Sequence, residues 1–167
     1  MYWYFINVQS KYTKRIMDFF NSQKNTTAFI PKTEKWIGAK SVRKYVLKDL
    51  YPDYIFVKSN LNENEFMDKY EKFFKDIKNA AVLVRQGNSY SMQKSMQDLY
   101  EKLFDQNGII KHSTGNIVQS KLKIDNGPLC GLEDSIIKIN RHDRTAKFDF
   151  KQNNFSLVVP LEIVTKS

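Results

Sequence analysis

The sequence predicts an α+β protein: an antiparallel sheet flanked by helices, then a linker, then a small β-barrel. Three observations lead to this prediction. Strand-like and helix-like segments alternate through residues 1–104, turn-forming residues dominate residues 105–116, and only short apolar runs of alternating polarity follow. An alternating order of this kind is best accommodated by an antiparallel sheet with helices packed on its faces.

The first segments are assigned from the spacing of their apolar residues. Residues 2–8 form an aromatic, strand-like run, and residues 28–31 and 54–57 are two further β-rich runs. After the first run, apolar side chains recur on one stripe of an amphipathic helix, with Ser10 available as its N-cap. That stripe comprises Tyr12, Ile16, Phe19 and Phe20. The polar, basic stretch 32–48 is expected to be an extended connection.

Two more helices and a strand are expected before the linker. Asn62 and Glu65 have the spacing of a capping box, with Asn in place of Ser. A second helical stripe follows, formed by Phe66, Tyr70, Phe73, Phe74 and Ile77. Residues 80–84 are a strand candidate, and a third helical stripe comprises Met92, Met96, Leu99, Tyr100 and Leu103.

The C-terminal residues contain short strands separated by turns. The predicted strands are residues 121–124, 135–139, 146–150, 155–159 and 161–164. Asn126, Gly127 and Pro128 predict a tight turn, and Gly131 permits a positive φ or a close approach of the backbone. Five short strands in so few residues favour a small β-barrel.

Charge and composition restrict the class of protein. The net charge is +9 and the pI is about 9.5, with +7 in residues 1–104 and +2 in residues 117–167. Such an excess of Lys and Arg favours a polyanionic partner, although many basic proteins are basic for solubility alone. Cys130 is the single cysteine, and no apolar run approaches the roughly 20 residues of a membrane span. We expect a monomeric, cytoplasmic protein without a signal peptide or a membrane partner.

Several stretches resemble the NusG family of transcription factors. Trp3-Tyr4 opens the first strand, Phe29-Ile30-Pro31 follows the first helix, and LYPDYIFV occupies positions 50–57. The Gly127-Pro128 turn, Gly131 and the strands after them resemble the KOW motif of SH3-like barrels. The resemblance implies an NGN-like RNA polymerase-binding domain at 1–104, a linker at 105–116 and a KOW domain, an SH3-like barrel, at 117–167. It further implies an elongation factor that rides on RNA polymerase.

Three departures from the family pattern indicate a specialised member. Asp53 stands where the middle strand often has glycine, and Asp134 stands at the third glycine of a common KOW pattern. The polar turn 151–154 replaces apolar and glycine residues with which the general factor contacts a ribosomal protein or a termination factor. The pattern is more similar to the operon-specific antitermination groups LoaP and RfaH.

The resemblance also implies two surfaces on the N-terminal domain. One is an apolar patch that receives a helical element of RNA polymerase, with Trp3, Tyr4, Tyr51, Tyr54 and Phe56 as its expected contacts. The alternative for each aromatic residue is packing in the core. The other surface is basic and is expected to contact upstream or non-template DNA through Lys11, Lys14, Arg15, Lys40, Arg43 and Lys44. The alternative there is an ordinary solvated surface.

The C-terminal barrel carries a third candidate surface. Its basic residues are expected to bind nascent RNA, such as a structured leader hairpin, through Lys121, Lys123, Lys138, Arg141, His142, Arg144 and Lys147. A solvated turn, or a protein partner, is the alternative. Three functions are therefore compatible with the sequence: an antitermination factor, a general elongation or pausing factor with a protein-binding KOW domain, and a ribosome-associated KOW protein.

Catalysis is not expected. Cys130, His112 and His142 are too few and too scattered for a zinc site, which needs four ligands at recurrent spacing. Cys130 and His142 lack an orienting third group for nucleophilic chemistry, and no phosphate-binding loop is present. We expect no metal, no cofactor and no enzymatic activity.

Overall fold

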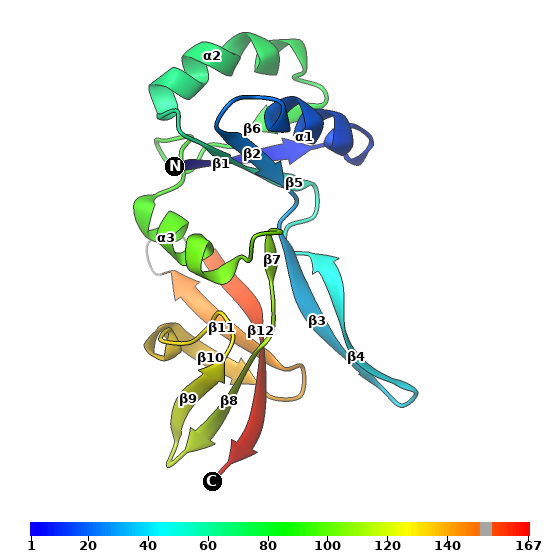
Figure 1. Ribbon diagram of the computed structural model, residues 1–167, viewed down its shortest axis with the longest axis vertical. Coiled ribbons are helices and arrows are strands. Elements are labelled where there is room, and N and C mark those ends of the chain that lie inside the picture. Colours follow the sequence, from blue (N-terminus) through cyan, green and yellow to red (C-terminus); the bar gives the residue numbers. More distant parts are fainter. Residues whose placement is uncertain (151–154) are drawn as a thin grey trace. The chain divides into compact units, whose positions relative to one another are not determined.

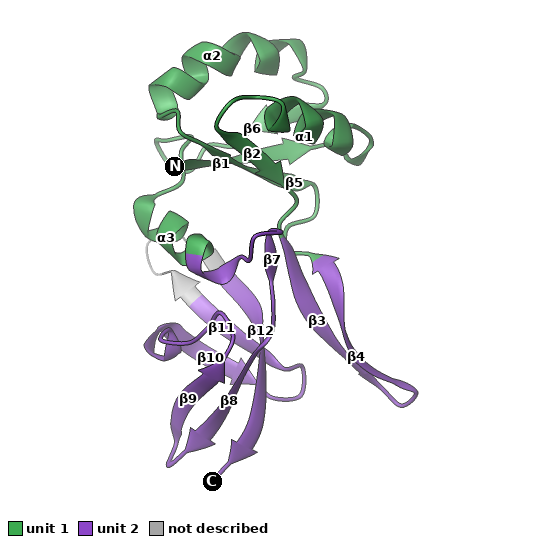
Figure 2. Ribbon diagram, in the orientation of Figure 1, with its two compact units in different colours: residues 1–31, 49–101 green, residues 32–48, 102–167 purple. Residues whose placement is uncertain are grey.

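The chain folds into two compact units, each built from two segments of the sequence. A computed structural model (Figure 1) describes residues 1–150 and 155–167. Unit 1 comprises residues 1–31 and 49–101, and unit 2 comprises residues 32–48 and 102–167 (Figure 2). In the described part of the chain, no helix combines the length and the apolar composition needed to cross a membrane.

Unit 1 is organised around a four-stranded sheet in which every pair of neighbours is antiparallel. The strand order is β2 (Thr26–Phe29), β5 (Tyr54–Ser59), β1 (Tyr2–Val8) and β6 (Ala81–Leu83). All four strands lie within two residues of the β-rich runs expected from the sequence. The prediction of a mixed fold with an antiparallel sheet and helices is confirmed for this unit.

The helices begin at the expected stripes, with one error at a helix start. They are α1 (Thr13–Asn21), α2 (Glu63–Asp76) and α3 (Lys94–Leu103). Ser10 is not the N-cap of α1, because it opens a short 3₁₀ turn, η1 (Ser10–Tyr12), that precedes the helix. The capping box of α2 is confirmed: Glu65 N donates to Asn62 Oδ1 at 3.1 Å, and Asn62 N donates to Glu65 Oε2 at 2.8 Å.

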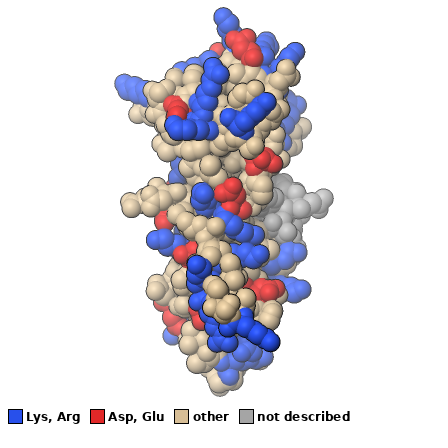
Figure 3. All heavy atoms as spheres, turned by 90° about the vertical axis from the view of Figure 1, so that its right-hand side faces the viewer, with Lys and Arg blue, Asp and Glu red and all other residues tan. Residues whose placement is uncertain are grey.

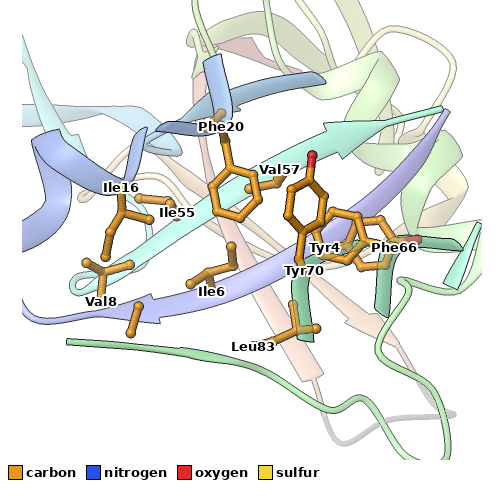
Figure 4. Close-up of a cluster of buried hydrophobic side chains, with 12 residues drawn as sticks. Tyr4, Ile6, Val8, Ile16, Phe20, Ile55, Val57, Phe66, Tyr70 and Leu83 are labelled. Carbon is orange, nitrogen blue, oxygen red and sulfur yellow. The ribbon is translucent and has the colours of Figure 1, made fainter. Parts of the chain in front are cut away.

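Helices α1 and α2 cover one face of the sheet and form the main hydrophobic core (Figure 4). Alternate residues of β1 and β5 point into this core, as the period of two in a strand requires. The buried residues are Tyr4, Ile6, Val8, Ile55 and Val57 from the strands, and Ile16, Phe20, Phe66 and Tyr70 from the helices. Tyr4 stacks on Phe66 with ring centroids 3.8 Å apart.

Unit 2 contains a β-hairpin that the sequence did not indicate. Residues 32–48, expected to be an extended connection, are extended, but their two halves pair as β3 (Lys32–Ala39) and β4 (Val42–Asp49). Strand β3 also pairs in parallel with the short strand β7 (Ile109–Ile110). We call β3 and β4 the hairpin.

A five-stranded sheet forms the rest of unit 2. Its strand order is β10 (Ile136–Asn140), β11 (Thr145–Phe150), β12 (Phe155–Lys166), β8 (Ser113–Val118) and β9 (Lys121–Asn126). A short 3₁₀ helix, η2 (Glu133–Ser135), precedes β10. The runs 155–159 and 161–164, expected as two strands, are one strand. Residues 105–116, expected to be a linker, contain β7 and the first part of β8.

The turn after β9 has the geometry expected from its glycines. Gly127 has a φ of +103°, and a Cβ placed there would lie 2.5 Å from the Oγ of Ser113. Ser113 Oγ in turn accepts a hydrogen bond from Leu129 N at 3.0 Å. Gly131 has a φ of +75°. Only glycine fits position 127, because both the conformation and the close approach exclude a side chain.

Candidate functional site

The second face of the unit 1 sheet carries a cluster of aromatic rings. Trp3 and Phe56 are fully buried there, and their ring centroids lie 5.9 Å apart in an edge-to-face arrangement. Phe29 packs edge-on against both rings, at 5.9 Å from Trp3 and 5.6 Å from Phe56. We call this surface the aromatic face; it comprises Trp3, Phe5, Phe29, Tyr51 and Phe56.

Helix α3 covers the aromatic face and adds polar contacts to it. Tyr100 lies 6.0 Å from Trp3, nearly parallel to it, and 5.4 Å from Phe56. Trp3 Nε1 donates a 3.0 Å hydrogen bond to Glu101 Oε1, and the hydroxyls of Tyr51 and Tyr100 lie 2.8 Å apart. Burial raises the pKa of both tyrosines, so both hydroxyls stay protonated at neutral pH.

A lysine adds a cation to the same cluster. The Nζ of Lys58 lies 4.2 Å from the ring centroid of Trp3 and 3.4 Å from Glu101 Oε1. The ring of Trp3 therefore has a cation over its face and a carboxylate at its N–H edge. These contacts fix the orientation of Trp3 more narrowly than apolar packing does.

The five expected polymerase contacts lie in three environments. Tyr4 belongs to the opposite face of the sheet, inside the α1–α2 core. Trp3 and Phe56 lie on the aromatic face but are fully buried beneath α3. Tyr51 and Tyr54 are half-buried. A partner can therefore touch Tyr51 and Tyr54 directly, whereas it reaches Trp3 and Phe56 only if α3 moves.

The turn before β5 explains how one departure from the family pattern is tolerated. Asp53 has a φ of +65°, in the left-handed region that glycine adopts most readily. Aspartate is among the residues that enter this region at low cost. The carbonyl oxygen of Asp53 accepts hydrogen bonds from Val8 N at 2.7 Å and from Asn7 Nδ2 at 3.3 Å. The turn thus keeps the conformation of a glycine turn.

The expected DNA contacts are exposed and fall into two groups. The first lies on η1 and α1 in unit 1 and comprises Lys11, Lys14 and Arg15. The second lies on the hairpin in unit 2 and comprises Lys40, Arg43 and Lys44. Lys14 forms an ion pair with Asp18 at 2.7 Å, one turn further along α1. Figure 3 shows Lys and Arg side chains on the surface of both units, with Asp and Glu among them.

The expected RNA contacts are distributed over the five-stranded sheet. Lys121 and Lys123 lie on β9, at the opposite end of the strand order from β10. Lys138 of β10 and Lys147 of β11 are cross-strand partners and share a face. The turn between β10 and β11 holds Arg141, His142 and Arg144. The expected turn 151–154 lies outside the described residues.

Arg144 is engaged within unit 2. Its Nη1 lies 2.7 Å from Glu162 Oε1, and its guanidinium carbon lies 3.6 Å from the ring centroid of Trp36. Tyr45 donates to Glu162 Oε2 at 3.5 Å, so the same carboxylate receives contacts from the hairpin and from the turn. Arg144 therefore ties the hairpin to the five-stranded sheet, and its side chain is only 27% exposed.

A second set of contacts connects the hairpin to β7 and β8. The ring of Tyr45 stacks on that of His112 with centroids 4.0 Å apart. Glu34 Oε2 accepts a 2.7 Å hydrogen bond from His112 N and lies 2.5 Å from His112 Nδ1. From the sequence, His112 is named only among the residues that are too scattered to form a zinc site, and no structural role is expected for it. The sequence pattern does not identify Trp36 and Tyr45 as structural contacts. Their presence as large aromatic residues in a mostly polar stretch is the feature from which such contacts could have been inferred.

Cys130 and the histidines do not form a shared metal or catalytic site in the described part of the chain. Cys130 Sγ lies 3.9 Å from the carbonyl oxygen of Ile124, and His112 contacts Tyr45. Across residues 1–150 and 155–167, no three His, Cys, Asp or Glu side chains gather closely enough to hold a metal ion.

The fold and these surfaces define a mixed α/β protein with an aromatic sheet face and basic surfaces. Residues 1–103 match the model of a protein family described as transcription termination factor NusG. The chain therefore belongs to the NusG family of transcription elongation and termination factors. The match covers unit 1, the hairpin and α3, and it ends before the five-stranded sheet. No curated protein matches the chain.

Proposed function

We propose that this chain is a processive antitermination factor of the specialised LoaP and RfaH kind. In this proposal the NGN-like residues 1–104 bind RNA polymerase. The C-terminal strands act as a KOW domain, an SH3-like barrel that binds nascent RNA. The lysines and arginines of α1 and the hairpin contact upstream or non-template DNA. The chain acts by binding, without catalysis, metal or cofactor.

Two partly exposed tyrosines at the edge of the aromatic face, Tyr51 and Tyr54, support the proposal that this surface binds polymerase. Tyr51 and Tyr54 are half-buried, so each exposes part of a ring that is held by the structure beneath it. The hydroxyl of Tyr51 is fixed by that of Tyr100 at 2.8 Å. Tyrosines that are held in place and half exposed are typical anchors of protein interfaces, because little side-chain freedom is lost on binding. Family membership supports polymerase as the partner.

Replacement of Tyr54 tests this docking surface. We expect Tyr54→Ala to weaken binding to RNA polymerase by about 1–3 kcal/mol, as for an interface anchor, with little change in melting temperature. Tyr90→Ala is the matched control, because Tyr90 is also a half-buried tyrosine of unit 1. Binding is measured by titration of purified polymerase. A large loss of melting temperature in Tyr54→Ala, with unaltered binding by the folded fraction, would assign Tyr54 to the core.

The exposed turn between β10 and β11 supports RNA as the second partner. Arg141 and His142 are exposed, and Lys138 and Lys147 share a face on the adjoining strands. Two exposed apolar residues of the same sheet favour the alternative of a protein partner: Ile137 is 55% exposed and Val158 is 48% exposed. A mobility shift of the full chain on the leader RNA of the regulated operon distinguishes the two. Binding at physiological salt supports the antitermination factor, and its absence supports a protein-binding factor.

A further inference from the structure

One hollow in unit 2 joins residues that the sequence assigned to two different nucleic acids. It has a volume of about 390 Å³ and is lined by Trp36, Gly38, Arg43, Arg141, His142, Asp143 and Arg144. Arg43 was expected to contact DNA, and Arg141, His142 and Arg144 were expected to contact RNA. Because the hairpin and the β10–β11 turn line one hollow, these residues form a single surface.

The lining of the hollow is rich in hydrogen-bond donors. Three arginines, a histidine and a tryptophan line the hollow, together with one carboxylate residue, Asp143. That carboxylate already accepts a 2.6 Å hydrogen bond from Asn140 Nδ2. With His142 neutral, the side chains that line the hollow carry a net charge of +2. A ligand that offers several acceptor oxygens and negative charge is the complement of such a lining.

The position of the Trp36 ring argues for a phosphate rather than a base. The guanidinium of Arg144 lies 3.6 Å from the ring centroid and occupies one face of the indole. Tyr45 lies 5.2 Å from the same ring. At Gly38 a Cβ would lie 2.7 Å from Trp36 Nε1, so the indole lies against the backbone of Gly38, which also lines the hollow. Because Arg144 occupies one face and Tyr45 lies close by, the indole is poorly placed to stack on a base.

The contacts that fix the walls of the hollow involve Arg144 and do not involve Arg43 or Arg141. Arg144 is fixed by Glu162 at 2.7 Å and by Trp36. Arg43 and Arg141, from the hairpin and the turn respectively, are exposed. These two side chains can therefore close on a ligand without disturbing the contacts that join the hairpin to the sheet.

We infer that this hollow binds a phosphodiester group of a nucleic-acid strand, with Arg43 and Arg141 contacting the same strand. The inference rests on the proposed nucleic-acid binding of the C-terminal strands and adds the hairpin to that site. The phosphate group is common to RNA and DNA, and the probes below distinguish the two.

The test compares four variants of the full chain by fluorescence titration over a range of salt concentrations. They are Arg43→Ala, Arg141→Ala, the double variant, and Lys72→Ala as a control that removes one exposed charge from unit 1. The probes are labelled oligouridylate and oligodeoxythymidylate, which are unstructured and present mainly phosphates and unpaired bases. Unchanged melting temperatures establish that the variants fold, as is expected for exposed side chains.

We expect Arg43→Ala and Arg141→Ala each to weaken oligonucleotide binding by roughly tenfold and to lower the salt slope by about one. The double variant should lose less than the product of the two single losses, because both residues contact one strand. Lys72→Ala should leave binding unchanged. Equal losses on both probes identify the phosphate as the recognised group, and losses on oligouridylate alone identify RNA as its source.

The contrary results separate this inference from the proposed function. If Arg141→Ala weakens RNA binding while Arg43→Ala matches the control on both probes, the shared hollow is wrong and RNA binding by the turn stands. If the wild-type chain binds neither probe but still binds polymerase, the hollow is wrong, and the mobility shift on the leader RNA decides the RNA partner separately. If losses in the two single variants multiply fully in the double variant, the two arginines act independently of each other, which contradicts a single shared site.

Discussion

The two faces of the unit 1 sheet use the same strands in different ways. On the α1–α2 face, the core is mostly apolar: the hydroxyl of Tyr4 donates to the carbonyl oxygen of Leu61 at 2.8 Å, and the buried hydroxyl of Tyr70 has no hydrogen-bond partner among the described residues. On the aromatic face, the rings have polar partners: Trp3 donates to Glu101, and Tyr51 meets Tyr100. The first face is closed mainly by apolar packing, whereas the second combines packing with hydrogen bonds between side chains.

This difference bears on the proposal that the aromatic face takes part in binding a partner while the α1–α2 core only stabilises the fold. Aromatic residues with a polar group are enriched where proteins meet, because they bury apolar area and keep a defined orientation. Alternation along β1 directs Tyr4 into the core and Trp3 to the aromatic face. The comparison predicts that mutations on the two faces affect stability and binding in different proportions.

The largest effect is expected from removing one buried ring on each face. Phe66→Ala and Phe56→Ala should each lower the free energy of unfolding by about 3–5 kcal/mol, because both side chains are fully buried. Only Phe56→Ala should also weaken polymerase binding by the folded fraction. Urea unfolding and polymerase titration measure the two quantities. Equal polymerase binding by the two variants would show that the aromatic face contributes to stability but not to polymerase binding.

A smaller effect separates two buried tyrosines. Tyr100→Phe should lower the free energy of unfolding by about 0.5–1.5 kcal/mol, because it removes the hydrogen bond to Tyr51. Tyr70→Phe should leave stability unchanged or raise it by up to about 1 kcal/mol, because it removes an unpaired buried hydroxyl. Thermal and urea unfolding of both variants check the signs. A loss in Tyr70→Phe as large as that in Tyr100→Phe would contradict the contrast.

The smallest effect concerns pH at the start of α2. Burial alone would raise the pKa of Glu63. Hydrogen bonds from Ser89, Tyr90 N and Ser91 to its carboxylate lower the pKa by more than burial raises it, so the pKa lies below its usual value. Glu63 therefore stabilises the fold above the unfolded pKa of about 4.3, and this contribution is lost as the pH falls through the folded pKa. Glu63→Gln should flatten the dependence of melting temperature on pH in the acidic range. A profile identical to wild type would exclude this role.

The sequence predicts the elements whose signals are local. The capping box of Asn62 and Glu65 and the stripe from Phe66 to Ile77 lie within one helix, so spacing alone identifies them. The hairpin was missed because its strands are polar and its turn, at Lys40 and Ser41, lacks glycine. Strand β8 was missed because Ser113, Thr114, Gly115 and Asn116 are turn-forming residues, although β8 pairs with β9, the next strand, as well as with the distant β12.

The candidate sites were predictable in their residue types and less so in their environments. The aromatic residues near Trp3 and Phe56 were identified, but their burial depends on α3 and could not be read from strand alternation. The basic turn was also identified, yet the role of Arg144 depends on Trp36 and Glu162, which come from other strands. Long-range pairs of this kind leave no periodic signal in one sequence.

The discontinuous origin of unit 2 has a consequence during protein synthesis. The hairpin emerges from the ribosome early, but its parallel partner β7 begins only at Ile109. At roughly 5–20 residues per second, the hairpin waits on the order of several seconds for that strand. Glu162, which fixes both Tyr45 and Arg144, is made later still. During this interval Trp36 and Tyr45 have each other as partners but lack His112 and Arg144, so the packing of the hairpin is completed only after most of the chain has been made.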